Sequence, residues 1–353
     1  MRLALVHRGL VCDVTPDLIT VGGLTVDNVV AADGTVALDV AGGNGAFSAA
    51  GALNWVRRVG LVSCAVASYP KETIARLEAG GVDLAGVIWR DATLSAGSWF
   101  LYDDAGRREE GLTAPGAALA EAGFPTDRLS PAQRVAWRSV LQDRAQSDET
   151  GYSGFRVLHP LTAAQVPASW ADAQGIHLAP SSLAVFGEML NFFAGKGAVI
   201  TADPGWQLAD LSLDELGPIL SRLDAFLPSE VELRALVPGA SVSDALAEVA
   251  ARFSGVLVVK MGPKGALVWD RSAGQPIDVP ARKVATRDPT GAGDSFCGGF
   301  LAGLVESGDP VQAARFGAIS AARTVSTFGA ADALPEDTTL ARAALQQEAS
   351  LCH

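Results

Sequence analysis

Cysteine and histidine are scarce in this chain of 353 residues, and each scarcity argues against a class of site. The four cysteines show no Cys-x-x-Cys spacing. Neither a zinc site nor a disulfide framework is therefore indicated, and reduced thiols in a cytoplasmic protein are expected. The four histidines have no carboxylate or second histidine at ligand spacing, which gives metal or Ser–His chemistry little support. We expect His177 to be a satisfied core residue and Cys297 to be a packed small residue.

Basic residues are few as well, because 27 Lys and Arg stand against 39 Asp and Glu, for a formal net charge of −12. The chain has no basic block or basic helix, which argues against nucleic acid or an anionic membrane as a partner. No apolar run approaches the length of a membrane span. Residues 1–16 lack a convincing signal-peptide cleavage region, so we expect an extension there.

Apolar residues, in contrast, make up 49% of the chain, enough for the core of one large α/β domain. Short apolar runs alternate with helical patterns. The expected strands are 18–23, 61–67, 176–179, 198–202 and 256–260. This alternation predicts βαβ units and a mostly parallel sheet with helices on both faces.

Two further stretches alternate apolar and polar positions and predict a separate small sheet that covers a cleft. Residues 26–40 do so around Asp33 and Gly34, which is a hairpin signal, and residues 96–108 form the second piece. Residues 111–155 are interpreted as an insertion, with a helix at 130–144 that begins with a capping box.

The residues at 287–300 organise the rest of the interpretation. Pro289, Gly291 and Gly293 do not fit a regular strand, so they indicate a tight turn that leads into a helix. The first N–H groups of a helix have no internal partner and carry partial positive charge, and small residues let a phosphate approach them. Asp294 follows at the rim, where a carboxylate can take a proton from a hydroxyl. An anion cradle beside a general base suits phosphoryl transfer.

For the tetrapeptide Gly-Ala-Gly-Asp alone, a helix start with a dipole-compensating Asp is the favoured explanation. The longer string Asp-Pro-Thr-Gly-Ala-Gly-Asp-Ser-Phe at 288–296 resembles the C-terminal signature of the ribokinase-like (pfkB) carbohydrate kinase family, which usually reads Asp-Thr-Thr-Gly-Ala-Gly-Asp-Ala/Ser-Phe. The resemblance implies a three-layer α/β/α domain over residues 17–335. Its β-sheet lid would comprise about 26–41 and 94–110, with a tail or helix at 336–353.

The resemblance also implies an activity, the ATP-dependent phosphorylation of a hydroxyl of a sugar or sugar-like molecule, with Mg²⁺. Asp294 would be the catalytic base, and Gly291, Ala292 and Gly293 would hold the charge of the moving phosphoryl group. The lid edges are open to pairing between subunits, so a homodimer through the lid is an expectation.

Residues 42–50 begin a helix of small residues that we expect to end near residue 60. The string resembles the family's N-terminal Gly-Gly signature, which implies that Gly42, Gly43 and Asn44 bind the substrate together with Asp27. As a dinucleotide fingerprint it lacks the third glycine. Phe47 stands where the family commonly has Asn, and Asn44 is a partial substitute. The acid that the family often carries near 67–69 is missing here.

The remaining implied roles concern the nucleotide and metal ions. By resemblance, the nucleotide is bound by Lys260, Gly262, Gly265, Thr327 and Gly329, although a plain hairpin explains the first two glycines equally well. Glu232 would support Mg²⁺ through water, while the spacing of Ser229 and Glu232 also fits a capping box. Asp288 matches a position where some members bind a monovalent cation.

Two alternatives remain open. A nucleoside kinase on the same scaffold would use Phe47, Trp99 or Phe100 to stack on a base. A catalytically degenerate sugar- or nucleotide-binding regulatory protein is suggested by Phe47, Ser68 and Ser229, and is opposed by the intact turn at 291–294.

Overall fold

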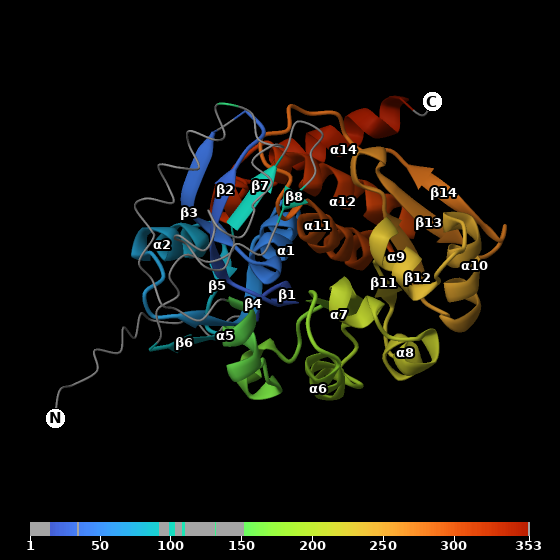
Figure 1. The fold of residues 1–353 in the computed structure, drawn as a ribbon, viewed down its shortest axis with the longest axis horizontal. Helices are drawn as coiled ribbons and strands as arrows, with labels where there is room; N and C mark the ends of the chain where they lie inside the picture. Colours follow the sequence, from blue (N-terminus) through green and yellow to red (C-terminus); the bar gives the residue numbers. More distant parts are fainter. Residues whose placement is uncertain are drawn as a thin grey trace.

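A large, mostly parallel sheet lies between two layers of helices (Figure 1). The computed structural model describes residues 15–33, 35–91, 99–102, 108–109, 131 and 152–351. The strand order is β14-β13-β12-β11-β10-β9-β1-β4-β5, and β6 also pairs with β4. The bounds of these strands are β1 Leu18–Val21, β4 Val59–Val66, β5 Val82–Asp83, β6 Val87–Arg90, β9 Gly175–Leu178, β10 Val199–Ala202, β11 Ala225–Phe226, β12 Val256–Lys260, β13 Ala266–Asp270 and β14 Gln275–Val279.

The apolar runs predicted as strands lie in the middle of the sheet, where both faces are covered. Strand β4 is buried along its whole length, and β1 pairs in parallel with both β4 and β9. Successive side chains of a strand point to opposite faces. Accordingly, Ile19 belongs to the core on one face, which includes Phe186 and Phe253, and Leu18 belongs to the core on the other face, which includes Phe316. The predicted parallel α/β fold is confirmed.

The helices begin where the chain supplies caps. Ser182, Ser212 and Ser241 accept hydrogen bonds from backbone N–H groups at the starts of α6, α8 and α10, and Asp309 does the same for α12. The helix bounds are α1 Asn44–Leu53, α2 Lys71–Ala79, α5 Tyr152–Leu158, α6 Leu183–Phe193, α7 Gly205–Ala209, α8 Leu213–Leu220, α9 Glu230–Leu236, α10 Val242–Arg252, α11 Ala292–Ser307, α12 Pro310–Val325, α13 Gly329–Asp332 and α14 Thr339–Leu351, with short 3-10 turns at Ala163–Gln165, Ala168–Trp170 and Gly262–Lys264.

Helices α1 and α11 approach so closely that side chains would not fit between their backbones. A Cβ on Gly298 would lie 1.8 Å from the carbonyl oxygen of Ser48, and one on Gly51 would lie 2.0 Å from that of Ser295. The small residues of both helices therefore fix the position of α11, whose first turn carries the sequence motif.

The predicted small sheet is present, with strand order β3-β2-β7-β8. Its strands are β2 Thr25–Val30, β3 Val36–Gly42, β7 Trp99–Tyr102 and β8 Arg108–Glu109. Strands β2 and β3 form the expected antiparallel hairpin, and in the turn between them Asp33 accepts a hydrogen bond from the N–H of Thr35 at 2.8 Å. Strand β7 adds to β2 in parallel, so two distant stretches of sequence form one sheet.

Helix α1 ends at Leu53, earlier than expected. The reason is Asn54, whose side-chain amide donates hydrogen bonds to the carbonyl groups of Ala50 and Gly51 and so satisfies the last turn. The helix predicted at 130–144 and the extension at 1–16 lie almost wholly outside the described residues, and the end of the expected insertion overlaps α5. None of the helices within the described ranges is long and apolar enough to cross a membrane.

Candidate active site

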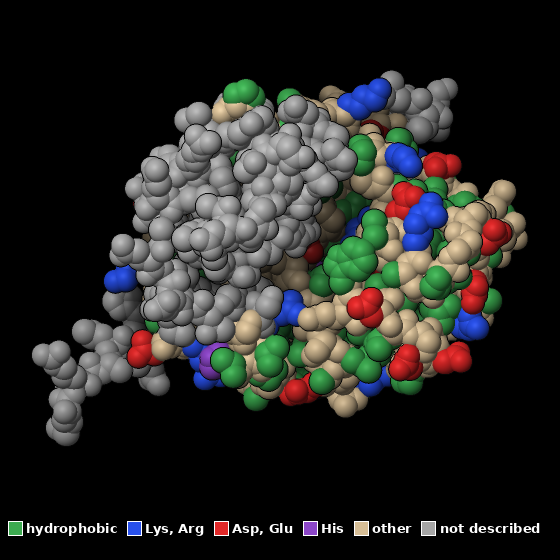
Figure 2. Space-filling model, viewed as in Figure 1, with side chains coloured by type: hydrophobic (Ala, Val, Ile, Leu, Met, Phe, Trp, Pro, Cys, Tyr) green, Lys and Arg blue, Asp and Glu red, His purple; other side chains and the backbone are tan. Residues whose placement is uncertain are grey.

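The candidate site lies at one edge of the main sheet, where several strands end. Gly22 follows β1, Pro180 follows β9 and Asp203 follows β10, while Lys260 is the last residue of β12. Because these strands are parallel, their carboxyl ends share one edge, which is where open α/β sheets bind ligands. Figure 2 shows that the visible face is hollowed near its centre, with acidic and basic atoms in the hollow.

The motif at 288–294 forms the tight turn that the sequence predicts. Gly291 has a φ of 74°, in the left-handed region that glycine adopts without strain. Thr290 donates its N–H to the carboxylate of Asp288 at 2.8 Å, and Ser295 donates its N–H to the carbonyl of Gly291. In the part of the chain that the structure describes, no side chain caps α11. The helix start is therefore not closed by a side chain, although the N–H of Ala292 already donates to the carbonyl of Pro289 at 3.3 Å. Asp294 stands half-buried in its first turn.

Phe47 forms the floor of this turn. Its ring is 2% exposed, and a Cβ on Gly291 would lie 2.1 Å from the ring carbon Cγ. The expectation that Phe47 stacks on a nucleoside base is therefore wrong, because the ring is fully used in packing beneath Gly291. Phe100 is also buried, in the small sheet's own apolar cluster, and the Trp99 side chain lies outside the described residues.

A buried ion pair lies next to the turn. The Lys260 ammonium group lies 3.7 Å from the position that a Cβ on Gly293 would take, and it contacts the carboxylate of Asp203. The side chains of both residues are nearly inaccessible to solvent. Cys297 Sγ lies 3.7 Å from the Lys260 nitrogen and 3.8 Å from an Asp203 oxygen.

Burial and charge shift the pKa values of this cluster in ways that keep Lys260 charged. Burial, opposed by the Lys260 charge and assisted by the charges of Glu232 and Asp294, raises the pKa of Asp203 to about 7. Burial alone would lower the pKa of Lys260, but the facing Asp203 carboxylate reverses the direction and raises it. Burial raises the pKa of the Cys297 thiol, which fits a packed small residue and opposes a nucleophile.

His177 lies in β9, and the charge of Lys260 acts on its ring. Its ring is fully buried, and Nδ1 is 2.9 Å from the hydroxyl of Thr201. Burial, together with the Lys260 charge, lowers its pKa to about 3. The predicted core position of His177 is confirmed, but its hydrogen bonding is only half satisfied, because Nε2 is buried without a hydrogen-bond partner among the described residues.

Glu232 completes the capping box that its spacing indicates. The Ser229 hydroxyl accepts from the N–H of Glu232, and the Glu232 carboxylate accepts from the N–H of Ser229 at 2.6 Å. Glu232 is buried, and its charge acts on both Asp203 and Lys260. Within the described ranges, no group of three His, Cys, Asp or Glu side chains is arranged to hold a metal ion without further ligands.

On the opposite side of the site, Asp27 and Gly42 are in direct contact. A Cβ on Gly42 would lie 1.7 Å from an Asp27 carboxylate oxygen, so only glycine leaves that carboxylate in place. Thr25 donates its hydroxyl to Asp27 at 2.7 Å, and Tyr69 donates its own to the carbonyl of Thr25. Tyr69, in the stretch 67–69 that lacks the expected acid, therefore supports Asp27 through Thr25.

Asn44 joins three loops at this edge of the sheet. Its side-chain oxygen accepts from the N–H of Gly23 at 2.6 Å, and its amide nitrogen donates to the carbonyl of Pro180 at 2.9 Å. Gly43, which precedes the helix, has a φ of 96°. Asn44 therefore fixes the backbone after β1 relative to the backbone after β9.

The residues predicted for the nucleotide are not gathered as tightly. Gly262 and Gly265 connect the antiparallel pair β12 and β13, as in the plain hairpin considered above. Thr327 donates its hydroxyl to the carbonyl of Thr324. A Cβ on Gly329 would lie 2.8 Å from Val40, so Gly329 lets α13 pack against the small sheet.

Three supporting residues escaped the sequence analysis: Asp203, Tyr69 and Tyr102. The hydroxyl of Tyr102, in β7, is 2.6 Å from that of Thr290, which ties the small sheet to the turn. Asp203 carried one signal, its place directly after an apolar strand and before Pro204. The partners of both tyrosines lie too far away in sequence to be found from spacing.

Known proteins match this chain in both sequence and fold. Residues 167–337 match the model of the pfkB family of carbohydrate kinases. The cytidine kinase of Thermococcus kodakarensis is 23% identical over 314 residues, which are 89% of this chain and 97% of that protein. The ribokinase of Lactococcus lactis is 32% identical over 114 residues, but these are only 32% of this chain and 36% of that protein.

Solved structures show the same fold at low identity. The nucleoside kinase of Methanocaldococcus jannaschii superposes with a TM-score of 0.61 at 18% identity, covering 95% of this chain and 99% of that one. The aminoimidazole riboside kinase of Salmonella enterica gives a TM-score of 0.62 at 17% identity, covering 93% and 99%. The resemblance to the ribokinase-like (pfkB) carbohydrate kinase family that the motif at 288–296 predicts is confirmed over residues 167–337, which include the motif.

Proposed function

We propose that this protein transfers the γ-phosphoryl group of ATP to a hydroxyl of a sugar or sugar-like molecule. The observation that carries the proposal is the start of α11, where a left-handed Gly291 opens an uncapped helix in the described chain and Asp294 stands in the first turn. The N–H groups at Gly291, Ala292 and Gly293 and the helix dipole would gather the charge that develops on the phosphoryl group. Asp294 would accept the proton of the attacking hydroxyl.

Lys260 adds a fixed positive charge to this anion hole. It lies beside Gly293, and the Asp203 carboxylate keeps it protonated and in place. Stabilisation of charge by groups that need not move during the reaction is the main contribution expected in phosphoryl transfer. Gly262, Gly265, Thr327 and Gly329 remain our prediction for the nucleotide side.

Glu232 and Asp294 supply carboxylate oxygens, the kind of ligand that Mg²⁺ prefers, but among the described residues no three acidic, His or Cys side chains are arranged to hold the ion by themselves. Water and the ATP phosphates would therefore supply most of its ligands. Glu232 would support the ion through water, and the ion would neutralise charge on the ATP phosphates. A solved Escherichia coli structure, named as a candidate ribokinase II, contains ATP and Mg²⁺; it is 19% identical with a TM-score of 0.62, over 94% of this chain and 99% of that one. Asp288, buried beside Thr290, remains our candidate for a monovalent cation.

The acceptor would lie against Asp27, between the two sheets. The Asp27 carboxylate would accept hydrogen bonds from acceptor hydroxyls, while Gly42 and Gly43 let the backbone approach. Both polar atoms of Asn44 bond to backbone groups, so Asn44 acts by holding the loops around the acceptor. A homodimer through the edges of the small sheet remains a prediction.

A nucleoside is the second candidate for the acceptor. The names of two relatives favour it, namely the cytidine kinase that aligns with 89% of this chain and the nucleoside kinase of Methanocaldococcus jannaschii. Both candidates place the reacting hydroxyl between Asp27 and Asp294, so they differ only in what lies beyond it.

ADP formation from ATP and Mg²⁺, measured against a panel of sugars, sugar acids, sugar phosphates and nucleosides, tests the proposal. We expect turnover on at least one member. Asp294→Asn should abolish it without loss of nucleotide binding. Binding of panel members without any turnover would overturn the proposal and favour the degenerate binding protein.

A further inference from the structure

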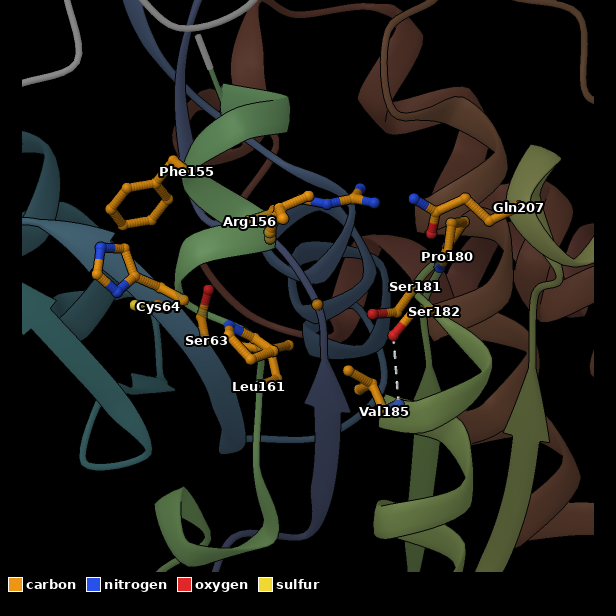
Figure 3. A pocket seen from close by; sticks show the side chains of 15 residues that line it. Ser63, Cys64, Phe155, Arg156, Leu161, Pro180, Ser181, Ser182, Val185 and Gln207 are labelled. Atoms are coloured by element: carbon orange, nitrogen blue, oxygen red, sulfur yellow. Dashed lines mark hydrogen bonds between the residues drawn. The ribbon is translucent and has the colours of Figure 1, made fainter. Parts of the chain in front are cut away.

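A cavity of about 270 Å³ lies beside the substrate side of the site (Figure 3). It is bounded by Gly22 and Gly23 after β1, by Ser63 in β4, by Pro180 after β9 and by the segment that includes α5. None of the residues so far assigned to the reaction lines it. Its lining residues come from regions far apart in the sequence, so it was not visible in the sequence.

Ser63 gives this cavity an unused hydrogen-bonding group. The residue is fully buried, and among the described residues its hydroxyl has no hydrogen-bond partner. Its backbone is fixed, because the Gln165 side chain donates to its carbonyl at 2.8 Å. In Figure 3 the hydroxyl points into the space that Arg156 and Ser181 also border. Leaving a buried hydroxyl unpaired costs about 1–3 kcal/mol, so a ligand atom that bonds to it is favoured.

The charges around the cavity favour an anion. The chain carries an excess of acidic residues, yet the described residues that line this cavity include Arg156 and no Asp or Glu. Figure 3 shows the Arg156 guanidinium group extending across the cavity toward the amide of Gln207. On the facing wall, α6 begins after Ser182, and a helix start adds partial positive charge.

The cavity shares its wall with the loops that hold the acceptor. A Cβ on Gly22 would lie 2.6 Å from the side-chain oxygen of Asn44, and Asn44 donates to the carbonyl of Pro180. Gly43 is in contact with the same wall, since a Cβ on it would lie 2.4 Å from the carbonyl oxygen of Gly23. The wall of the cavity is therefore in direct contact with Gly43 and Asn44, two of the residues predicted to bind the acceptor.

We propose that the cavity is a subsite for an anionic substituent of the acceptor, a carboxylate or a phosphate, held by Arg156, Ser63 and the start of α6. The inference rests on the proposed kinase function and defines its substrate class as sugar acids or sugar phosphates instead of neutral sugars. A planar guanidinium group suits both anions, because it can donate two parallel hydrogen bonds to either one.

The test compares matched acceptors that share one sugar and carry a neutral group, a carboxylate or a phosphate. We expect kcat/KM from ADP formation to be at least about tenfold higher for one of the anionic members, through a lower KM, because a charge-assisted hydrogen bond supplies about that factor. Whichever anion shows the gain identifies the substituent. Arg156→Gln and Ser63→Ala should each raise the KM for that acceptor and leave kcat and the KM for the neutral sugar unchanged.

Arg252→Gln, which removes a guanidinium group paired with Glu248 on the exposed face of α10, is the matched control and should change neither constant. If the wild type uses neutral and anionic acceptors equally and Arg156→Gln changes nothing, the subsite is overturned while the kinase stands. If nothing is turned over, the kinase proposal fails, and calorimetry of the same sugar acids and sugar phosphates without ATP decides the cavity. Binding that Arg156→Gln weakens supports the anion subsite, and no binding to the wild type overturns it.

Discussion

The two sides of the candidate site, the one proposed for the phosphates (the phosphate side) and the one proposed for the acceptor (the acceptor side), are built in different ways. On the phosphate side, seven consecutive residues, 288–294, form the turn, and its shape follows from the left-handed Gly291 and local backbone hydrogen bonds. On the acceptor side, Asp27 depends on Thr25, Gly42 and Tyr69, and the adjoining cavity combines residues from β1, β4, α5 and α6. A local structure can be recognised in one sequence, whereas an assembled one depends on how the whole chain packs.

The two sides also differ in the interactions that hold their residues in place. The turn rests on the buried ring of Phe47 and beside the Asp203–Lys260 pair, so charge and packing hold it together. The acceptor side rests on hydrogen bonds between neutral groups and one carboxylate. Substitutions should therefore affect stability most on the phosphate side and acceptor affinity most on the other.

The largest effect on stability is expected from Lys260→Met. The substitution leaves the Asp203 carboxylate buried without its cation, which should lower the free energy of unfolding by about 3–5 kcal/mol. Urea denaturation measures the loss. The double variant Lys260→Met, Asp203→Leu is the control, because it removes both charges and should recover much of the stability. A loss below about 1 kcal/mol in the single variant would show that the pair does not support the turn.

A smaller effect of another kind is expected from Gly42→Ala. The added methyl group would overlap the Asp27 carboxylate and displace it. We expect the KM for the acceptor to rise about 10- to 100-fold, equivalent to about 1.4–3 kcal/mol, with the KM for ATP unchanged. Gly217→Ala is the matched control, because a Cβ at that position in α8 meets nothing within 4 Å. Equal rises in both KM values would contradict the separation of the two sides.

The most gradual effect is the pH dependence of stability that His177 contributes. Its pKa is about 3 in the folded protein and has a reference value of 6.5, so between these values the unfolded chain binds a proton that the folded chain does not. Stability from this residue is complete above pH 6.5 and falls by about 1.4 kcal/mol per pH unit as the pH decreases toward 3. His177→Asn should reduce the slope of unfolding free energy against pH by that amount in this window. An unchanged slope would show that the folded protein protonates the ring.

The sequence predicted the structural features that depend on residues close together in the chain. The turn at 288–294, the hairpin around Asp33 and the capping box of Ser229 and Glu232 were all found from spacing, because each depends on residues within a few positions. The role of Phe47 was wrong, since its partner Gly291 lies more than 240 positions away.

The residues that the sequence analysis missed also depend on partners that are distant in sequence. Tyr102 meets Thr290 only because β7 joins the small sheet, and Ser63 borders a cavity only because α5 covers the end of β4. The length of α1 was overestimated because residues 55–59 contain no glycine or proline that would mark an earlier end, whereas the helix ends at the cap that Asn54 supplies. Such contacts follow from the packed fold and leave no fixed spacing in the chain.

The central claim is that Asp294 acts on the acceptor and is more than a favourable charge at a helix start. Asp244 provides the comparison, because both residues occupy the third helical position, Asp244 in α10 and Asp294 in α11. Removing either charge should cost about 0.3–1 kcal/mol of stability through the helix dipole. Single-turnover rates of phosphoryl transfer should therefore be compared for Asp294→Asn and Asp244→Asn. The account predicts a loss of about 10³-fold for Asp294→Asn and none for Asp244→Asn, and equal rates in the two variants would contradict it.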